Sequence, residues 1–250
     1  MVRMVDGLPR VSVALCCLNE GANLPQVIAR LKTLGERLGD QLHEIVVVDG
    51  GSTDGSWEVL ERLAAEWQLV KLLRQQPPRG YGSGYRQSVL ACSGDVIATS
   101  DMDLNYDVTE VARMLPLLSE ADLVIANPFL CGAEAWLSPS RMLLTHGVAS
   151  LYRLALIGRK DVGTVFTPIL RVGNAEIVRG AVPQSDTFTA SAEFMTRVYL
   201  LTDARVREVP VSVFHRGAGV SKLHKFRTAM GHLRWLGRVI AYRMKLRKAL

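Results

Sequence analysis

The chain has 250 residues, 48% of them hydrophobic and 22% charged, which is typical of a folded globular protein and excludes a disordered or fibrous one. This length favours one large domain. Ten of the 30 basic residues and no acidic residue lie in 209–250, so the net charge of +6 belongs to a basic C-terminal segment on a slightly acidic body.

Apolar runs and amphipathic segments alternate through the first 130 residues. The runs predict buried strands, and apolar residues at helical spacing between them predict helices. Strands and helices that alternate in this way favour right-handed crossovers, so we expect an α/β fold with a mostly parallel, Rossmann-like twisted sheet flanked by helices. The expected strands are 11–18, 44–49, 69–73, 95–100 and 121–126, and the expected helices are 23–38, 56–67, 85–93 and 108–119.

The second half of the chain is less regular. Pro210 places the strand predicted there at a sheet edge, because proline cannot donate a ladder hydrogen bond. Glu193 stands four residues before Arg197 on a predicted helix, a spacing that favours a surface ion pair as the structural role of Glu193. The expected elements are helices 138–158 and 187–201, a strand over 205–214 and a basic loop over 215–222.

Polar clusters follow three of the predicted strands. They are Asn19-Glu20, Asp49, and the pair Asp101 and Asp103. The carboxyl edge of an open α/β sheet is where ligands bind. Residues i and i+2 of an extended chain point the same way, and Mg²⁺ often shares carboxylate ligands with substrate phosphates. We therefore predict a phosphate and metal site at this edge; the structural alternative is a turn in which each Asp bonds its own backbone.

A glycine-rich segment follows the third predicted strand. Gly80, Gly82 and Gly84 alternate there, but neither the dinucleotide fingerprint nor the Walker loop is present. Arg79 and Arg86 flank the glycines and would suit a diphosphate. A plain flexible turn is the alternative interpretation.

A long basic helix is predicted from about residue 221 to the end of the chain. Its cations lie between two apolar stripes, so one stripe can dock on the domain while the other contacts an anionic membrane surface. A helix buried in a homodimer or on its own core is the alternative, and no nucleic-acid motif accompanies the cations. The stripes are Phe226, Met230, Leu233, Ile240 and Met244, and Trp235, Val239, Tyr242 and Leu246.

The sequence predicts no zinc site, no disulfide, no membrane span and no signal peptide. The four cysteines form no Cys-x-x-Cys, and no histidine has a partner at metal-ligand spacing, which speaks against zinc and against disulfides. No run reaches the roughly 18 apolar residues of a membrane span, and the N-terminus lacks the apolar core of a signal peptide. We expect a cytoplasmic protein, peripheral on the cytoplasmic face of the membrane.

Several motifs follow one another along the chain. They are Leu18-Asn-Glu, Val47-Val-Asp-Gly-Gly-Ser-Thr-Asp-Gly, Arg79-Gly-Tyr-Gly-Ser-Gly-Tyr-Arg, Asp101-Met-Asp-Leu-Asn, Arg141, Asp161, Phe188-x4-Glu and Glu208-Val-Pro-Val-x4-Arg-x2-Gly-x-Ser-Lys-Leu. In this order they resemble the inverting GT-A glycosyltransferases of family 2, and within them the dolichyl and polyprenyl phosphate mannose synthases. The resemblance implies a catalytic domain over 1–220, with a nucleotide-sugar half at 1–130 and an acceptor half at 131–220, and a C-terminal basic amphipathic helix over 221–250.

The resemblance also implies roles for individual residues. Asp103 and Asn105, with Asp101, would hold Mg²⁺ or Mn²⁺. Asp101, Asp103, Arg216 and Glu193 would be catalytic, and Arg141, Arg216 and Lys222 would bind the acceptor phosphate. The nucleotide sugar, linked to GDP or UDP, would contact Leu18, Asn19, Glu20, Asp49, Arg79, Gly80, Asp101 and Met102.

The sequence departs from the family pattern around base and acceptor. Cys16-Cys17-Leu18 stands where Pro-x-Tyr is usual, Gly50 replaces an Asp, Thr167 an Arg and His215 an Asp. The base, the sugar and the acceptor chain are therefore not predicted, nor is a separate membrane subunit. A hydroxyl acceptor, with Asp186 or Glu193 as general base, is one alternative. A non-catalytic module that binds sugar nucleotides is another.

Overall fold

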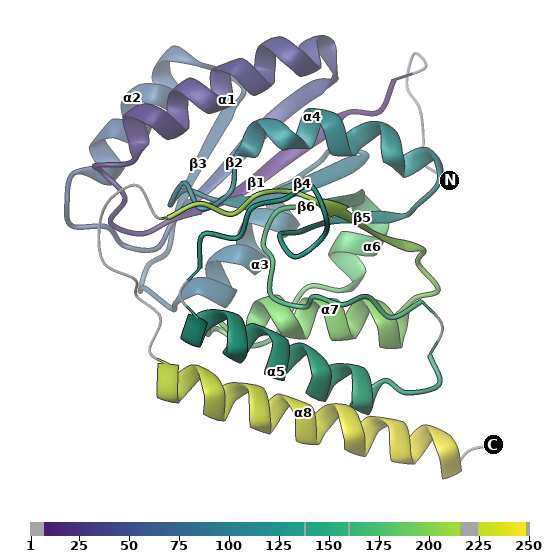
Figure 1. Ribbon diagram of the computed structural model, residues 1–250. Coiled ribbons are helices and arrows are strands. Elements are labelled where there is room, and N and C mark those ends of the chain that lie inside the picture. Colours follow the sequence, from purple (N-terminus) through teal and green to yellow (C-terminus); the bar gives the residue numbers. More distant parts are fainter. Residues whose placement is uncertain (1–7, 138, 160, 216–224, 249–250) are drawn as a thin grey trace.

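A single mostly parallel sheet organises the protein. The computed structural model describes residues 8–137, 139–159, 161–215 and 225–248 (Figure 1). The sheet has seven strands in the order β3-β2-β1-β4-β6-β5-β7. The strands are β1 (Val11–Cys17), β2 (Leu42–Asp49), β3 (Val70–Arg74), β4 (Val96–Asp101), β5 (Leu123–Asn127), β6 (Arg171–Asn174) and β7 (Val206–Pro210).

Helices cover both faces of this sheet. In Figure 1, α1, α2 and α4 lie on one side, and α3 and α5 to α8 lie on the other. The helices are α1 (Leu24–Leu38), α2 (Ser56–Glu66), α3 (Tyr81–Ala91), α4 (Val111–Met114), α5 (Pro139–Ala155), α6 (Ala175–Gly180), α7 (Ala190–Leu201) and α8 (Lys225–Lys248), with the short 3-10 turns η1 (Gly39–Gln41), η2 (Val108–Glu110) and η3 (Leu115–Ser119).

The side chains on the two faces of the central strands belong to two separate hydrophobic cores. Val13 and Leu15 of β1 pack with Leu31 of α1 on one face. On the other face, Ala14 of β1 joins a cluster with Phe194 of α7. A strand buried on both faces reads as a continuous apolar run, which is why the sequence pattern of β1 and β2 predicts them well.

Three element predictions need correction. The helix expected over 108–119 is broken into η2, α4 and η3, and Pro116, which has no backbone N–H, stands in the first turn of η3. Helix α3 begins at Tyr81, inside the predicted glycine loop. Strand β6 was not predicted, and it runs antiparallel to β4 and β5 between them. The edge position of Pro210 is confirmed, because β7 is the last strand of the sheet.

The C-terminal helix α8 docks on the domain through one face, as predicted. Trp235 Nε1 donates to Thr196 Oγ1 of α7 at 2.7 Å, and Val239 is 1% exposed. Arg243 donates to the carbonyl of Ala155 at 2.6 Å, which ties α8 to the end of α5. Trp235 and Val239 of the second predicted stripe lie on the docked face, whereas Tyr242 of the same stripe is 40% exposed. Among the residues that the structure describes, no helix is both long and apolar enough to cross a membrane.

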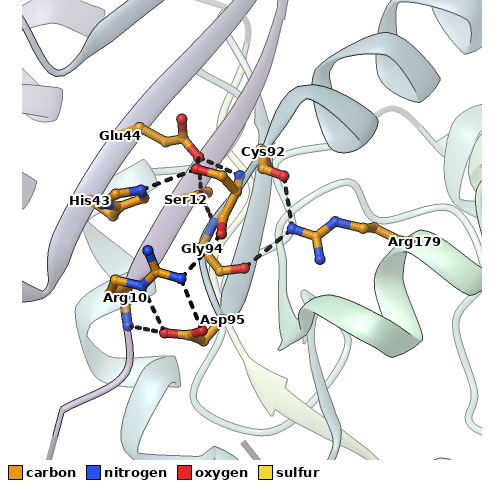
Figure 2. A network of polar contacts seen from close by, with 9 residues as sticks. Arg10, Ser12, His43, Glu44, Cys92, Gly94, Asp95 and Arg179 are labelled. Atoms are coloured by element: carbon orange, nitrogen blue, oxygen red, sulfur yellow. Dashed lines mark hydrogen bonds and ion pairs between the residues drawn. The ribbon is translucent and has the colours of Figure 1, made fainter. Parts of the chain in front are cut away.

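A polar network closes the edge of the sheet at which β1, β2 and β4 begin (Figure 2). Glu44 is 1% exposed and accepts from Ser12 Oγ at 2.7 Å and Ser93 Oγ at 2.8 Å. The Ser93 N–H also donates to this carboxylate, and Lys71 forms an ion pair with it. The network fixes the turn before β4.

The network predicts an acid-sensitive stability. Burial by itself would raise the pKa of Glu44, but Lys71 and the hydrogen bonds of Ser93 and Ser12 outweigh it, so the pKa is about 2 instead of 4.5. A depressed folded-state pKa adds stability that is complete above the unfolded value near 4.5 and is lost as the pH falls toward 2. Glu44→Ala strands buried donors and should cost about 1–3 kcal/mol at pH 7 in urea unfolding.

The control for this prediction is Glu61→Ala, on the exposed side of α2. Glu44→Ala should also flatten the fall in stability between pH 5 and pH 2, because the group that titrates is gone. If the free energy of unfolding of Glu44→Ala falls between pH 5 and pH 2 as steeply as that of the wild-type protein, other carboxylates are responsible for the acid sensitivity.

Candidate active site

The three predicted polar clusters meet at one edge of the sheet. Cys17 of β1 pairs with Asp49 of β2, and Cys16 pairs with Asp101 of β4. The segments that leave β1, β2 and β4 therefore emerge side by side. This is the ligand-binding edge of an open α/β sheet, as the sequence predicts.

The polar and apolar side chains of the acidic motif lie on opposite sides of the chain. Burial alternates after β4, with Met102 and Leu104 at 1% and 6% exposure while Asp101, Asp103 and Asn105 are half-buried. Leu104 has φ 63°, a left-handed conformation that is rare for a branched residue and costs about 1–3 kcal/mol. The turn at Leu104 brings Asn105 Nδ2 within 2.6 Å of Asp103 Oδ2.

These side chains fit a divalent cation that arrives with a phosphate ligand. In the part of the chain that the structure describes, no three His, Cys, Asp or Glu side chains gather closely enough to hold a metal by themselves. Mg²⁺ commonly needs only one or two carboxylates, because it keeps several waters and takes oxygens from substrate phosphates. Asp103 and Asn105, with Asp101 two residues away, supply such a partial ligand set.

Two half-buried side chains, Tyr81 and Cys16, lie close to Asp101. Burial and the Asp101 carboxylate raise the pKa of the Tyr81 hydroxyl. The same two causes raise the pKa of the Cys16 thiol. Both groups are therefore neutral at physiological pH.

The loops after β1 and β2 hold each other in place. Asn19 N–H donates to Ser52 Oγ at 2.8 Å, and Thr53 N–H returns a bond to Asn19 Oδ1 at 2.8 Å. Asp49 is fully buried and accepts from the backbone N–H of Gly51 and Ser52 at 3.0 Å each. The structure thus gives Asp49 a turn-forming role, and its contact with a ribose stays a prediction.

Glu20 also forms hydrogen bonds within these loops. It is 7% exposed, and Asn23 Nδ2 donates to its Oε2 at 2.7 Å. Its backbone N–H donates to Ser56 Oγ at 2.9 Å, at the start of α2. Leu18, beside it, is 37% exposed at the same edge. Glu20 and Leu18 therefore lie at the carboxyl edge of the sheet, and their contacts with a nucleotide remain predictions.

The glycine-rich segment contacts the chain at 183–186. The N–H of Gly82 donates to the carbonyl of Asp186 at 3.0 Å. A Cβ on Gly82 would lie 2.0 Å from the Ser185 carbonyl oxygen, and one on Gly80, which has φ 101°, would lie 2.7 Å from that of Asp186. These glycines allow a close approach of two backbones, so the flexible-turn interpretation is wrong.

The two arginines around these glycines differ in their surroundings. Arg86 donates to the carbonyl of Pro183 at 2.8 Å and to Asp186 Oδ1 at 2.7 Å. It is therefore committed to the 183–186 segment, and the prediction that it suits a diphosphate is not supported by its contacts. The Arg79 side chain is 61% exposed, with Nε 3.9 Å from Asp186 Oδ2, so its charge is available to a ligand.

Glu193 has a different role from the surface ion pair that its spacing suggested. It is 1% exposed, and its carboxylate accepts from the N–H of Gln184 at 2.8 Å and of Ser185 at 3.0 Å. The surface-pair prediction is wrong, because α7 turns this face toward the 183–186 segment. Glu193 therefore fixes the segment that packs on Gly82.

Some predicted site residues lie outside the described part of the chain. Arg216 and Lys222 fall in 216–224, and the side chain of Arg141, in the first turn of α5, is not described either. Their predicted contacts with an acceptor phosphate stay predictions. The loop before β6 is described, and Glu208 of β7 pins it by accepting from the Val165 N–H at 3.1 Å.

The pairing of 134–136 with 213, beside the acidic motif, was not predicted. Val213 N–H donates to the carbonyl of Glu134 at 2.8 Å, and Phe214 N–H donates to the carbonyl of Asn105 at 2.8 Å. This pairing carries Trp136, which is 53% exposed, to this side of the site. The exposed tryptophan shortly after a predicted strand was the one available signal.

An open α/β sheet with an acidic metal-type motif at the carboxyl end of its fourth strand is the architecture of a GT-A transferase. Residues 12–178 match the glycosyl transferase family 2, and the chain belongs to that family. The predicted fold class is confirmed, since solved GT-A structures superpose on most of the chain.

Two curated relatives are similar to this chain in sequence. The chain is 26% identical over 235 residues, 93% of its length, to a dolichol-phosphate mannosyltransferase of Pyrococcus furiosus. It is 34% identical over 125 residues, 47% of its length, to an undecaprenyl-phosphate 4-deoxy-4-formamido-L-arabinose transferase of Pseudomonas syringae pv. syringae. The matches span 64% and 35% of those two proteins, which are longer than this chain.

Solved structures share the fold. Glucosyl-3-phosphoglycerate synthase of Mycobacterium tuberculosis in complex with UDP superposes with a TM-score of 0.66 at 20% identity, over 93% of this chain and 80% of that one. The same enzyme with Mn²⁺, UDP and glucosyl-3-phosphoglycerate gives a TM-score of 0.64 at 18% identity, over 94% and 80%. At these identities the likeness shows the fold.

Proposed function

We propose that this chain is an inverting glycosyltransferase that moves a sugar from a nucleotide-diphosphate sugar to a polyprenyl phosphate. The observation that carries the proposal is the acidic motif, which presents Asp101, Asp103 and Asn105 on one side at the carboxyl edge of the sheet. Relatives named for dolichol-phosphate and undecaprenyl-phosphate transfer support the acceptor class. Mannose, glucose or a related sugar, linked to GDP or UDP, is the proposed donor.

Asp103 and Asn105 would hold the metal ion in this proposal. Mg²⁺ or Mn²⁺ bound there would neutralise charge that grows on the leaving diphosphate. Asp101 lies closer to the sheet and would face the ribose and diphosphate of the donor. Arg79 is exposed enough to reach a phosphate, and Arg141, Arg216 and Lys222 are proposed for the acceptor phosphate.

The contacts of the two candidate bases favour a phosphate acceptor over a hydroxyl acceptor. A hydroxyl needs a general base within hydrogen-bond reach. Glu193 is buried, and its carboxylate accepts hydrogen bonds from two backbone N–H groups. The Asp186 carboxylate forms an ion pair with Arg86. A phosphate monoester has a second pKa of about 6, is already ionised at neutral pH, and needs only cations and placement.

Product identity tests the proposal. The full chain is incubated with Mn²⁺, labelled GDP-mannose or UDP-glucose, and undecaprenyl or dolichyl phosphate. A lipid-extractable sugar phosphate that mild acid releases, with inverted anomeric configuration, is the expected product. Label that appears only in water-soluble product would favour the hydroxyl-acceptor alternative and overturn the proposed acceptor.

A non-catalytic sugar-nucleotide module is the alternative of another class. Asp101→Ala separates the two possibilities. For an enzyme we expect loss of turnover with the fold retained, whereas a module shows no turnover before or after the change. Wild-type transfer with any acceptor of the panel would exclude the module.

We also propose that α8 and α5 rest on an anionic membrane surface. The two helices lie side by side at one end of the molecule (Figure 1), joined by Arg243. Both expose apolar side chains, and Arg234, Arg238 and Lys245 are exposed on α8. An exposed apolar face bordered by cations suits the interface of an anionic bilayer. The exposed apolar residues are Leu143, Leu151 and Leu154 on α5 and Met230, Leu233, Ile240 and Met244 on α8.

Charge reversal on α8 tests this surface without exposing the core. Arg234→Glu with Arg238→Glu should weaken binding to phosphatidylserine-containing vesicles about tenfold or more, because each cation near such a surface is worth about 1 kcal/mol. Arg62→Glu, exposed on α2, is the matched control. Equal co-sedimentation of both variants with the wild-type protein would contradict the proposed membrane surface.

A further inference from the structure

A fully buried arginine without an acidic partner lies in the strand next to β4. Arg171, the first residue of β6, is 1% exposed, and an arginine side chain is always charged in proteins. Among the residues that the structure describes, its guanidinium forms no ion pair, and its Nε has no hydrogen-bond partner. Burial of a charge without a counter-ion is costly, so a purely structural role would be served better by a neutral side chain.

The contacts of Arg171 show how the charge is tolerated. Its Nη2 donates to the Ser191 carbonyl at 3.0 Å and to Ser191 Oγ at 2.7 Å, and its Cζ lies 4.6 Å from the ring centre of Phe194. These groups are dipoles and a π face, which solvate a cation without neutralising it. Ser191 Oγ also donates to the Thr167 carbonyl at 2.9 Å, so the serine keeps a partner without the arginine. None of these neighbours requires a positive charge.

The register of the sheet places this charge close to the acidic motif. Arg171 pairs with Thr99 of β4, and Asp101 follows Thr99 by two residues. Directly opposed residues share a face of the sheet, as do residues i and i+2 of one strand, so Arg171 and Asp101 lie on one face at a diagonal separation of roughly 7–8 Å. Cys16, the β1 partner of Asp101, packs against the core that contains Phe194, which gives the same face.

The Tyr81 hydroxyl responds to both charges. Burial and the Asp101 carboxylate raise the pKa of this hydroxyl, and Arg171 acts on it in the opposite direction. Tyr81 lies one helical turn before Tyr85 on α3, and the Tyr85 hydroxyl accepts from Arg171 Nη1 at 3.4 Å. Charges in a protein interior are screened far less than charges at the surface, so Arg171 and the acidic motif act on each other across this short distance.

A buried cation behind the motif has opposite effects on the two parts of the expected ligand. It repels a divalent cation near Asp103 and Asn105, and it attracts a diphosphate that the two carboxylates of the motif would otherwise repel. The ligand set of the motif is partial, so a bare ion gains little there and cannot easily offset this repulsion. A metal ion that carries a diphosphate retains the attraction.

We infer that Arg171 is a buried counter-charge of the acidic motif, which weakens the binding of a bare divalent cation, strengthens the binding of a nucleoside diphosphate, and so makes the two bind together. The inference rests on the proposed function and deepens it, because it assigns how the donor site selects the metal–diphosphate pair over either part. Arg171 touches neither part and acts through space.

Two neutral substitutions test the counter-charge in the full chain. Mn²⁺ alone is titrated with the free ion followed by electron paramagnetic resonance, and UDP and GDP are titrated by calorimetry in EDTA. Arg171→Met should bind Mn²⁺ more tightly and the nucleoside diphosphate more weakly, each on the order of tenfold, as expected for one charge at this separation in a protein interior. Arg171→Gln, which can still donate to Ser191, should shift both affinities in the same two directions.

Two further variants separate charge from structure. Arg171→Lys keeps the charge and loses the planar fork, so it should bind both ligands nearly as the wild-type chain does. Arg37→Met removes an equal charge from an exposed position in the last turn of α1, near the start of β2, where solvent screens it, and it should change neither affinity.

The signs of the two shifts decide the outcome. A merely structural role of Arg171 would weaken both ligands in every variant at this position, together with the thermal midpoint, and would overturn the inference. Unchanged affinities in Arg171→Met and Arg171→Gln would overturn it as well, as would an Arg171→Lys variant that behaves like the neutral ones. A wild-type chain that binds neither nucleoside diphosphate, with or without Mn²⁺, would instead overturn the proposed function.

Discussion

Asp103→Asn should lower the rate of sugar transfer about 10²–10³-fold, the loss typical of removing one electrostatic contact to developing charge. The substitution keeps the shape of the side chain and one acceptor oxygen, so it can keep one of the two bonds that Asp103 accepts, from Asn105 N–H at 3.1 Å and from Asn105 Nδ2 at 2.6 Å. The negative charge offered to the metal is lost together with the other bond. The increase in nucleotide affinity that Mn²⁺ produces should disappear with it.

The measurement is a titration of UDP and GDP with and without Mn²⁺, alongside the rate of transfer. Asp203→Asn is the control, because that carboxylate is fully exposed on the surface and lies outside the acidic motif. Wild-type Mn²⁺ dependence in Asp103→Asn would move the metal away from this carboxylate and undermine the motif as the metal site.

The sheet edge that carries this motif was predictable because its strands are buried on both faces. Strands β1, β2 and β4 read as long apolar runs, and a polar residue directly after such a run marks the carboxyl end of the strand. Parallel pairing then brings Asp49 and Asp101 to the same edge. Sequence and topology together were sufficient to predict the location of the acidic cluster.

Strand β6 was not predictable from the same pattern. It has four residues and begins with Arg171, which a hydropathy pattern assigns to the surface. In the structure Arg171 is 1% exposed, with its guanidinium 4.6 Å above the ring centre of Phe194 and Nη2 2.7 Å from Ser191 Oγ. Long-range contacts that satisfy a buried charge leave no local trace in the sequence.

The role of Glu193 shows the same limit at the site. Its i,i+4 relation to Arg197 is local, whereas its partners are backbone groups of Gln184 and Ser185 on a preceding loop. The glycine spacing has a similar explanation, because Gly82 contacts a segment about a hundred residues further along the chain. Spacing identified these residues as special, and only the fold identified their partners.

The close contact between Gly82 and the Ser185 carbonyl predicts that Gly82→Ala destabilises the protein and weakens substrate binding. The new Cβ would lie 2.0 Å from the carbonyl oxygen of Ser185 and 2.8 Å from the Cβ of Ala190, and a backbone atom cannot move aside as the end of a side chain can. Overpacking of this kind costs about 1–3 kcal/mol and occasionally more. The segment 183–186 should move off α3, and the KM for the nucleotide sugar should rise.

Gly84→Ala supplies a matched control two residues further along α3. Its Cβ would meet Gln75 Nε2 at 3.5 Å and Cys16 Sγ at 3.6 Å, which is ordinary contact, so this variant should gain about 0.5–1 kcal/mol as alanine replaces glycine in a helix. Both variants remove the same backbone freedom from the unfolded chain, so the difference between their free energies of unfolding isolates the contact with Ser185.

Hydrogen exchange at Gln184 and Ser185, whose N–H groups donate to Glu193, reports the displacement of the segment 183–186 directly. Faster exchange in Gly82→Ala alone would tie the glycine spacing to the placement of this segment, whereas equal protection and stability in both variants would show that the segment accommodates a methyl group and that the glycines serve another purpose.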